Sequence, residues 1–316
     1  INDYVHTIGG SLQMDWCFPD GMNWPLHLEP APVRAPTFSL ALITPRGKRE
    51  EKLRDDRVNT FKGVLDGKDI RLTINDDFIY GYVRTGDEEW YIEPLKRFVD
   101  NAASNTYLLY RTRDVLPQSN LRCGQTETAR VTSESAGGAR GGCLEVDLAV
   151  AADYSMFEHY GSAGGVLAHL EGVLNNVNGN FDDDFSQGLF FRMSELVMPI
   201  VESSDPWYSG EDALQLLESF KEWGHGGGFQ SDFDLGQFWS RRNYQSQGSG
   251  SVIGLSYVGT FCSENGYHIL EDFTGSAGYI RVMTAHEIGH NFGCSHNYNG
   301  TQLECYSNNR PPYIMD

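Results

Sequence analysis

The pattern of hydrophobic and polar residues divides the chain into a β-rich first part and an α/β second part. Residues 69–75 alternate polar and apolar side chains, which is typical of a half-buried strand. Further strand-like segments lie at residues 38–43, 78–83, 90–92 and 108–110. Prolines and glycines predict an ordered coil for residues 1–36, and the charged residues 46–57 predict a solvated loop or helix face. We therefore expect a small, mostly β domain that ends near residue 123.

The pattern changes on either side of a stretch that lacks large apolar residues. Residues 124–142 are rich in Gly, Ser, Thr and Ala, which predicts a flexible linker. Residues 143–152 form a nearly continuous apolar run, typical of a strand buried on both faces. Helical spacing at 165–177 and 212–223 alternates with strand-like segments at 188–201, 235–239 and 252–258. A last helix is predicted from about Gly278, so residues 143–316 read as an α/β domain.

This last helix contains Thr-Ala-His-Glu-Ile-Gly-His-Asn-Phe-Gly-Cys-Ser-His at residues 284–296. His286 and His290 are four residues apart, so they project from one face of the helix and can hold one zinc ion. Gly293 can end the helix in a left-handed turn, which lets the chain fold back and bring His296 to the same metal. Three protein ligands leave one position open, as a catalytic zinc requires.

Glu287 follows the first ligand and is well placed to take a proton from a zinc-bound water. A bare His-Glu-x-x-His motif occurs by chance on many solvated helices, but the extended motif fixes five positions in eleven residues. Met315, in Tyr-Ile-Met-Asp, lies nineteen residues beyond His296, where a methionine turn is expected under the zinc. On its own Met315 would be an ordinary core methionine.

The extended motif resembles that of the metzincin zinc endopeptidases, and His-Glu-Ile-Gly-His-Asn-Phe-Gly resembles the ADAM (adamalysin/reprolysin) family. Within that family the chain is most similar to the sheddase branch that contains TNF-alpha converting enzyme and Kuzbanian. Gly-Leu-Ser-Tyr-Val-Gly at 254–259 resembles the Gly-Leu-Ala-Tyr-Val-Gly strand of that branch. Residues 90–98 resemble its prodomain signature, and Leu-Arg-Cys-Gly at 121–124 resembles its cysteine switch.

The resemblance implies a latent zinc endopeptidase with a mostly β prodomain at 1–123, a linker at 124–142 and a metzincin protease domain at 143–316. Such a protease domain packs helices on a twisted mixed sheet and carries an active-site helix and a methionine turn. The resemblance also implies that the strand with Ile253, Gly254 and Leu255 pairs with an extended protein or peptide substrate. From the residues alone this strand is a plain sheet edge.

Cys123 is the candidate for the fourth zinc ligand. A thiolate can fill the open position and displace the water, with Arg122 nearby to favour the thiolate. From spacing alone a disulfide or a buried free thiol is the favoured interpretation, because a lone Cys-Gly carries little information. The resemblance instead favours the switch and makes the chain's own prodomain the inhibitor. By the same resemblance, disulfide partners fall at Cys143, Cys262 and Cys305.

Composition restricts the partners and the compartment. The chain has 24 basic and 43 acidic residues, a net charge of −19, which argues against nucleic acid and anionic membranes as partners. No apolar run approaches the roughly 20 residues that a membrane-spanning helix needs. Asn299-Gly-Thr301 is an acceptor for glycosylation in a secretory protein, so we expect a secreted or cell-surface protein.

Two departures from the family pattern keep an alternative open. Asn297 stands where an aspartate usually follows the third histidine, and no Arg-x-Lys/Arg-Arg cleavage site lies between Cys123 and Cys143. The chain can therefore also be interpreted as a masked structural component of a larger extracellular assembly that retains a zinc site. The intact Glu287 favours the endopeptidase, because a scaffold needs no general base.

Overall fold

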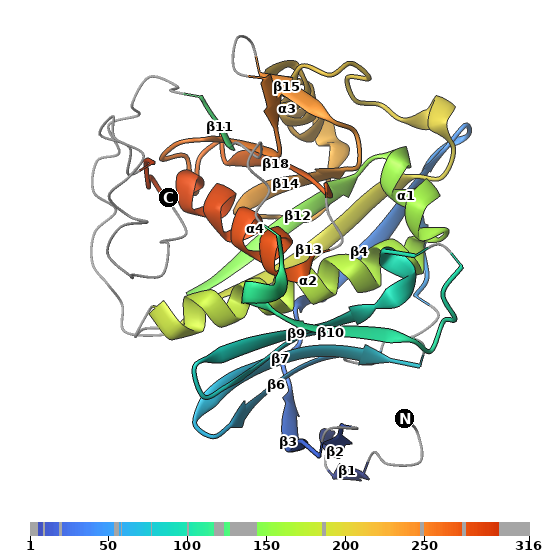
Figure 1. The fold of residues 1–316 in the computed structure, drawn as a ribbon. Helices are drawn as coiled ribbons and strands as arrows, with labels where there is room; N and C mark the ends of the chain where they lie inside the picture. Colours follow the sequence, from blue (N-terminus) through green and yellow to red (C-terminus); the bar gives the residue numbers. More distant parts are fainter. Residues whose placement is uncertain are drawn as a thin grey trace.

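Two eight-stranded sheets lie on either side of a long helix in the computed structural model of the chain (Figure 1). The structure describes residues 6–8, 10–18, 21–53, 57, 59–76, 78–99, 101–116, 123–126, 144–184, 188–246, 250–273 and 276–296. We call the described residues up to 116 the N-terminal segment and the described residues from 144 to 296 the protease half.

The first sheet is built entirely from the N-terminal segment, and all its neighbouring strands are antiparallel. Its order is β1 (His6–Ile8), β2 (Ser11–Cys17), β3 (Asn23–Pro30), β6 (Thr60–Leu65), β7 (Lys68–Asn75), β8 (Phe78–Thr85), β9 (Glu88–Pro94) and β10 (Tyr107–Arg111). The meander predicted from residue 69 onward is confirmed.

The coil predicted for residues 1–36 is wrong, because β1, β2 and β3 lie within it. In β3, Trp24, Leu26 and Leu28 are buried while the residues between them are exposed, which is the two-residue period of a strand. The prolines and glycines around this segment hide that period in the sequence, but Pro25 and Pro30 are both accommodated within the strand.

The second sheet is mixed and combines strands from both parts of the chain. Its order is β11 (Cys123–Thr126), β17 (Gly254–Tyr257), β18 (Tyr267–Glu271), β14 (Leu235–Ser240), β12 (Leu144–Ala152), β13 (Leu189–Pro199), β4 (Arg34–Thr44) and β5 (Gly47–Glu51). Only the β17–β18 and β4–β5 pairs are antiparallel. The mixed α/β organisation expected for the second part of the chain is confirmed.

Strands β4 and β5 join the N-terminal segment to the sheet of the protease half. The sequence predicts the strand at residues 38–43 but places it in the β domain, whereas β4 pairs in parallel with β13. The loop or helix predicted at 46–57 is wrong over Gly47–Glu51, since β5 pairs with β4 as a charged edge strand. At the other edge, residues 124–126 of the predicted linker belong to β11. The domain division at residues 123 and 143 stays a prediction.

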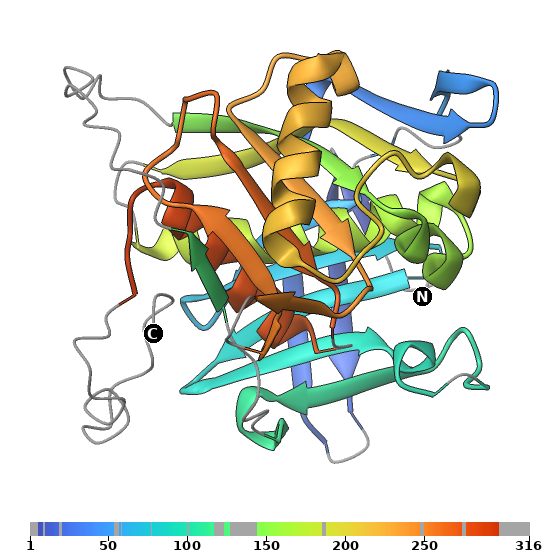
Figure 2. The same cartoon turned by 90° about the horizontal axis from the view of Figure 1, so that it is seen from above.

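Helices cover both faces of the second sheet (Figures 1 and 2). The helices are α1 (Tyr154–Tyr160), α2 (Ala163–Asp184), α3 (Ala213–Trp223) and α4 (Ala277–Asn291). The alternation of β12 explains the two layers: Leu148 and Val150 pack with α2 and α4, and Ala149 and Ala151 pack with α3. Helix α2 lies between the sheets, with β6, β7 and β8 on one side and β13 on the other.

Smaller elements complete the described chain. They are the hairpin of β15 (Tyr244–Ser246) and β16 (Gly250–Val252), the short 3-10 helices η1 (Leu95–Arg97), η2 (Thr112–Asp114) and η3 (Glu202–Ser204), and the π-helical turn η4 (Gly224–Gly228). The sequence pattern misses β6, α1, β15, β18 and most of β16. Within the described ranges, no helix combines the length and apolar character needed to cross a membrane.

Candidate metal centre and active site

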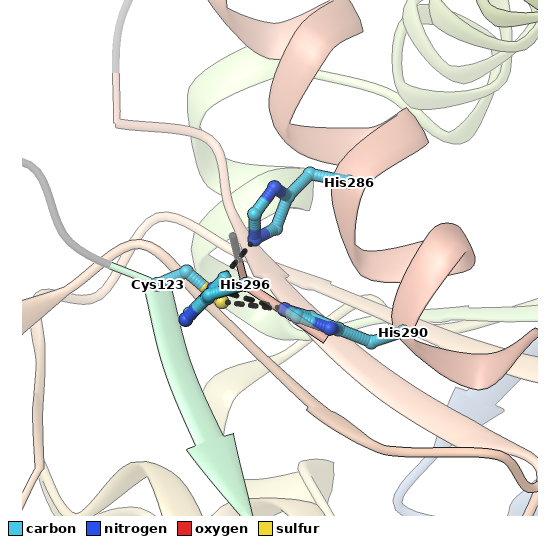
Figure 3. A group of neighbouring side chains, drawn as sticks. All are labelled: Cys123, His286, His290 and His296. Carbon is cyan, nitrogen blue, oxygen red and sulfur yellow. Dashed lines mark hydrogen bonds between the residues drawn. The ribbon is translucent and has the colours of Figure 1, made fainter. Parts of the chain in front are cut away.

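Helix α4 carries two of the candidate zinc ligands and directs the third. His286 and His290 lie one turn apart in its last two turns, and both are buried. The predicted left-handed turn is present, since Gly293 has a φ of 96°. The N–H of Gly293 donates to the carbonyl of His290 at 2.8 Å. The chain then reverses, and the ring of His296 faces the two helix histidines (Figure 3).

Four donor atoms from α4, β11 and the turn after α4 point toward one centre (Figure 3). The Nε2 atoms of His286 and His290 lie 3.0 Å and 3.1 Å from Nε2 of His296. The Sγ of Cys123 lies 3.4 Å from Nε2 of His290. A tetrahedral zinc with ligands at about 2.0–2.3 Å would separate neighbouring donors by about 3.3–3.6 Å. The three separations lie within about 0.3 Å of this spacing, and three imidazoles and a thiol are a donor set that zinc takes.

The tautomer of His290 also fits a metal. Its Nδ1 donates to the carbonyl oxygen of Cys294 at 2.7 Å, so the neutral ring keeps a lone pair on Nε2, which faces the centre. Burial and the neighbouring rings lower the pKa of His290 to about 4, against the smaller opposing effect of that hydrogen bond. Burial and His286 lower the pKa of His296 to about 4. Both rings are thus neutral near pH 7, which is the form that binds a metal.

Cys123 reaches the centre because β11 adds to the free edge of β17. The two strands pair in parallel, with Cys123 opposite Gly254 and Gly124 opposite Leu255. Burial, together with the nearby Glu287 carboxylate, raises the pKa of the Cys123 thiol. A cation among the four donors would reverse this effect, because a thiol that coordinates a metal is deprotonated.

Glu287 is fully buried beside the metal ligands, and its carboxylate is fixed by β17. The hydroxyl of Ser256 bonds to its Oε2 and also lies 3.0 Å from its backbone carbonyl. Oε1 lies against Gly254, where an added Cβ would overlap the carboxylate. The space left by Gly254 is therefore filled by Glu287. Burial raises the pKa of Glu287 to about 7, and the bonds with Cys123 and Ser256 oppose this rise.

The protease half matches a known family of peptidases over its whole described length. Residues 144–316, more than half of the chain, match metallo-peptidase family M12. The chain belongs to this family. Membership of family M12 implies zinc, and the described residues contain one cluster of Cys and His donors.

Several curated relatives are similar to this family M12 chain. It is 28% identical to a zinc metalloproteinase/disintegrin from Bitis gabonica over 166 residues, 52% of the chain and 48% of the relative. It is 23% identical to the zinc metalloproteinase-disintegrin-like BmMP from Bungarus multicinctus over 240 residues, 70% of the chain and 36% of the relative. A zinc metalloproteinase-disintegrin-like protein from Cerberus rynchops is 24% identical over 232 residues, 66% of the chain and 34% of the relative. The matches thus span less than half of each relative's length.

Some predicted site residues cannot be placed beside the metal ligands. Met315, Arg122, Asn297, Cys143 and Cys305 lie outside the described residues, as does the glycosylation motif at 299–301. Cys262 and Cys294 are exposed and, in the part of the chain that the structure describes, take part in no disulfide. Of the predicted substrate strand, Gly254 and Leu255 lie in β17 and pair with β11. Ile253 precedes β17, and its carbonyl accepts the N–H of Glu271.

The sequence motifs do not predict two residues that support the site, Ser256 and Asn291. Ser256 holds the candidate base, and the signal for it is the serine where the resembling strand has alanine. Asn291 follows His290 and fixes the end of α4: its amide donates to the carbonyls of Tyr257 and Tyr267, and its Oδ1 lies 2.7 Å from Nδ1 of His268. Nothing in the local sequence marks these long-range contacts.

Proposed function

We propose that the chain is a zinc-dependent endopeptidase of the ADAM sheddase type, held in a latent form by Cys123. The observation that carries the proposal is the convergence of Cys123, His286, His290 and His296 on one centre with the carboxylate of Glu287 beside it. Membership of family M12 and the zinc metalloproteinases among the relatives support the chemistry. Residues 1–123 act as the prodomain and residues 143–316 as the protease domain.

In this proposal His286, His290 and His296 hold the zinc, and Met315 is the methionine of the predicted turn. When bound, zinc acts as a Lewis acid that polarises the scissile carbonyl and brings the pKa of a coordinated water to about 7. Glu287 takes the proton of the attacking water and delivers it to the leaving amine. Because Ser256 engages Oε2, Oε1 is the oxygen that receives the proton.

An extended peptide is the substrate class that the site favours. Strand β17 offers backbone groups at Gly254 and Leu255 to an added strand, and β11 now occupies that edge. Together with Ile253, these residues bind the substrate backbone once β11 has left. The substrates are extracellular proteins or the extracellular parts of membrane proteins, and the chain acts as a secreted or cell-surface protein, alone or in a larger assembly.

Latency follows from the double role of β11. Its backbone covers the edge of β17, and its Cys123 thiolate would be the fourth ligand of a bound zinc and would take the place of a water. Because β11 belongs to the same chain, the thiol competes with water at a high effective concentration. Activation then requires that β11 leave the edge.

A pair of variants tests the assignment of the metal and the base. In a Cys123→Ala background, which removes the proposed inhibitor, the chain should hold about one zinc ion and cleave extended fluorogenic peptides. Adding Glu287→Gln should keep the zinc and lower kcat by about 100-fold or more, because Gln cannot accept the proton. Adding His290→Ala should remove the zinc.

Adding Ser203→Ala, a change at an exposed serine, is the control that should alter neither zinc content nor rate. Unchanged cleavage by the Glu287→Gln chain would exclude Glu287 as the base. Full zinc content in the His290→Ala chain would exclude the three-histidine site.

A further inference from the structure

We propose that the N-terminal segment is a permanent structural layer of the active enzyme, and that only β11 has to leave the site for activation. A cut between β11 and β12 would then yield a two-chain enzyme rather than a freed protease half. The inference rests on the proposed function, because activation here means the gain of the proposed peptidase activity. The evidence for the layer itself is independent of catalysis.

Strand β4 completes the sheet on which the active site is built. It pairs with β13 from Glu195 opposite Ser39 to Pro199 opposite Ile43. Its side chains enter both layers of the core: Leu40 and Leu42 pack with α2, and Ala41 packs with α3. Loss of β4 would expose these apolar side chains and the edge of β13 from Met193 to Pro199, which is a costly and aggregation-prone surface.

Helix α2 is shaped to receive the first sheet. A Cβ on Gly172 would overlap the ring of Tyr80, and a Cβ on Gly179 would overlap the hydroxyl of Tyr82. The two glycines are seven residues apart and therefore lie on one face of the helix. Glycine inside a helix costs about 1 kcal/mol relative to alanine, and the packing of the two tyrosines of β8 accounts for both glycines.

Two asparagines of α2 connect the helix to opposite sheets. The amide of Asn175 donates to the carbonyls of Phe61 and Leu72 in the first sheet, both at 3.1 Å. Asn178 exchanges two hydrogen bonds with the backbone of Phe191 in the second sheet, at 2.8 and 3.0 Å. Both asparagines are fully buried. Removal of the first sheet would leave the face of α2 that carries Asn175 without its partners.

The active-site helix itself begins on the N-terminal segment. Ser276 occupies the N-cap position of α4 but makes no side-chain capping bond. Instead, the N–H of Ala277 donates to Oε1 of Glu93 on β9 at 2.7 Å. Glu89, also on β9, binds Arg281 on the next turn at 3.0 Å. A carboxylate at a helix N-terminus satisfies a free N–H and complements the helix dipole.

Buried charges make the separation of the two layers more costly still. Arg97 of η1 is almost fully buried, and its Nη1 lies 3.0 Å from Nδ1 of His169 on α2. Arg34 of β4 pairs with Glu171 of α2 at 2.5 Å, and Lys48 of β5 pairs with Glu195 of β13 at 2.7 Å. Leaving a buried charge without its partner typically costs about 3–5 kcal/mol, so these pairs oppose release.

Strand β11 is attached much more lightly than this layer. It has four residues, and among the described strands it pairs only with β17, while Cys123 adds its contact with the candidate metal centre. No other described element of the N-terminal segment touches β17 through a sheet register. The inhibitory contact and the structural contact are thus carried by different stretches of chain.

The test is a specific cut in the folded full chain. A recognition sequence for a sequence-specific protease is inserted within residues 127–142, between β11 and β12, and cleavage is followed to completion on a denaturing gel. We expect the two fragments to elute together in size-exclusion chromatography at about 100 nM protein, and to separate only in denaturant. The proposal would be overturned if the C-terminal fragment eluted alone and still unfolded at the same temperature as the uncut chain.

Two glycine substitutions on one helix provide the matched variants. Gly179→Leu places a side chain where Tyr82 packs and should lower the fraction of N-terminal fragment retained after the cut by about 10-fold or more. Gly164→Leu lies near the start of α2 with open space around it, so retention should stay as in the parent chain. Both changes raise helix propensity, so a loss at residue 179 alone reports the contact.

Equal retention in both variants would contradict the proposed docking face. If the Gly179→Leu chain does not fold, the cut parent chain still decides the question. The readout is fragment mass and elution, not peptidase activity. If the two fragments stay associated but show no peptidase activity, the result contradicts the proposed function and still supports the structural layer.

Discussion

At the scale of single residues, the chemistry of the site depends on contacts that surround the motif. His286, His290 and His296 are brought together by local geometry, a helix and a left-handed turn, so their spacing in the sequence is enough to predict them. Ser256 is thirty-one residues from Glu287 in the chain, and only the docking of α4 on β17 makes them neighbours. Such a contact cannot be derived from sequence spacing.

Ser256→Ala should therefore impair the chemical step without disturbing the metal. The variant removes the bond that orients Oε2 of Glu287, and the loss of about 1 kcal/mol corresponds to a fall in kcat of about 5- to 10-fold. KM and zinc content should stay unchanged, because Ser256 contacts neither substrate nor metal in this proposal. Steady-state kinetics in the Cys123→Ala background check the prediction. An unchanged kcat would show that Ser256 does not position the base.

At the scale of elements, periodicity predicts which residues form strands but not which sheet receives them. The apolar run at residues 38–43 identifies β4. Its partner β13 lies about 150 residues away in the chain, and the sequence near β4 does not predict that pairing. The same holds for β11, which joins β17 across a comparable distance. These two non-local pairings determine how the N-terminal segment meets the active site.

Strand β11 gives a prediction of its own. Cys123→Ala removes the proposed fourth ligand but leaves the backbone of β11 on β17. Peptidase activity of the uncut chain should rise by roughly 10- to 100-fold and remain below that of a chain whose site is fully open, because the substrate edge is still covered. Cys17→Ala, a change at an exposed cysteine on β2, is the control and should have no effect. A zinc-loaded Cys123→Ala chain with unchanged activity would rule out latency through this thiol.

At the scale of the whole molecule, charged groups are buried inside the protease half. Asp272 and His169 are fully buried and lie within 3.5 Å of each other, and Arg241 binds the same aspartate at 2.6 Å. Composition alone gives a net charge of −19 and no indication that individual charges lie inside. Buried pairs of this kind make the stability of the chain depend on pH in a way that only the structure can predict.

Glu271, at the end of β18, should set part of that dependence. Burial raises its pKa to about 7, against the effects of the Tyr244 N–H and of Arg241. Its unfolded pKa is about 4.3, so the folded chain holds the proton more tightly, and this contribution to stability is complete below about pH 4. It is lost as the pH rises through about 7. Glu271→Gln cannot ionise, so it should gain stability relative to the parent chain by about 1–3 kcal/mol between pH 5 and pH 8.

Chemical denaturation at the two pH values measures this difference. Glu158→Gln, on α1, serves as the control, since it makes the same chemical change at an exposed carboxylate. The comparison is a difference between variants, so the other titrating groups of the protein cancel. If Glu271→Gln loses stability relative to the parent as the pH rises, the buried carboxylate is ionised and paired instead, and the sign argued above is wrong.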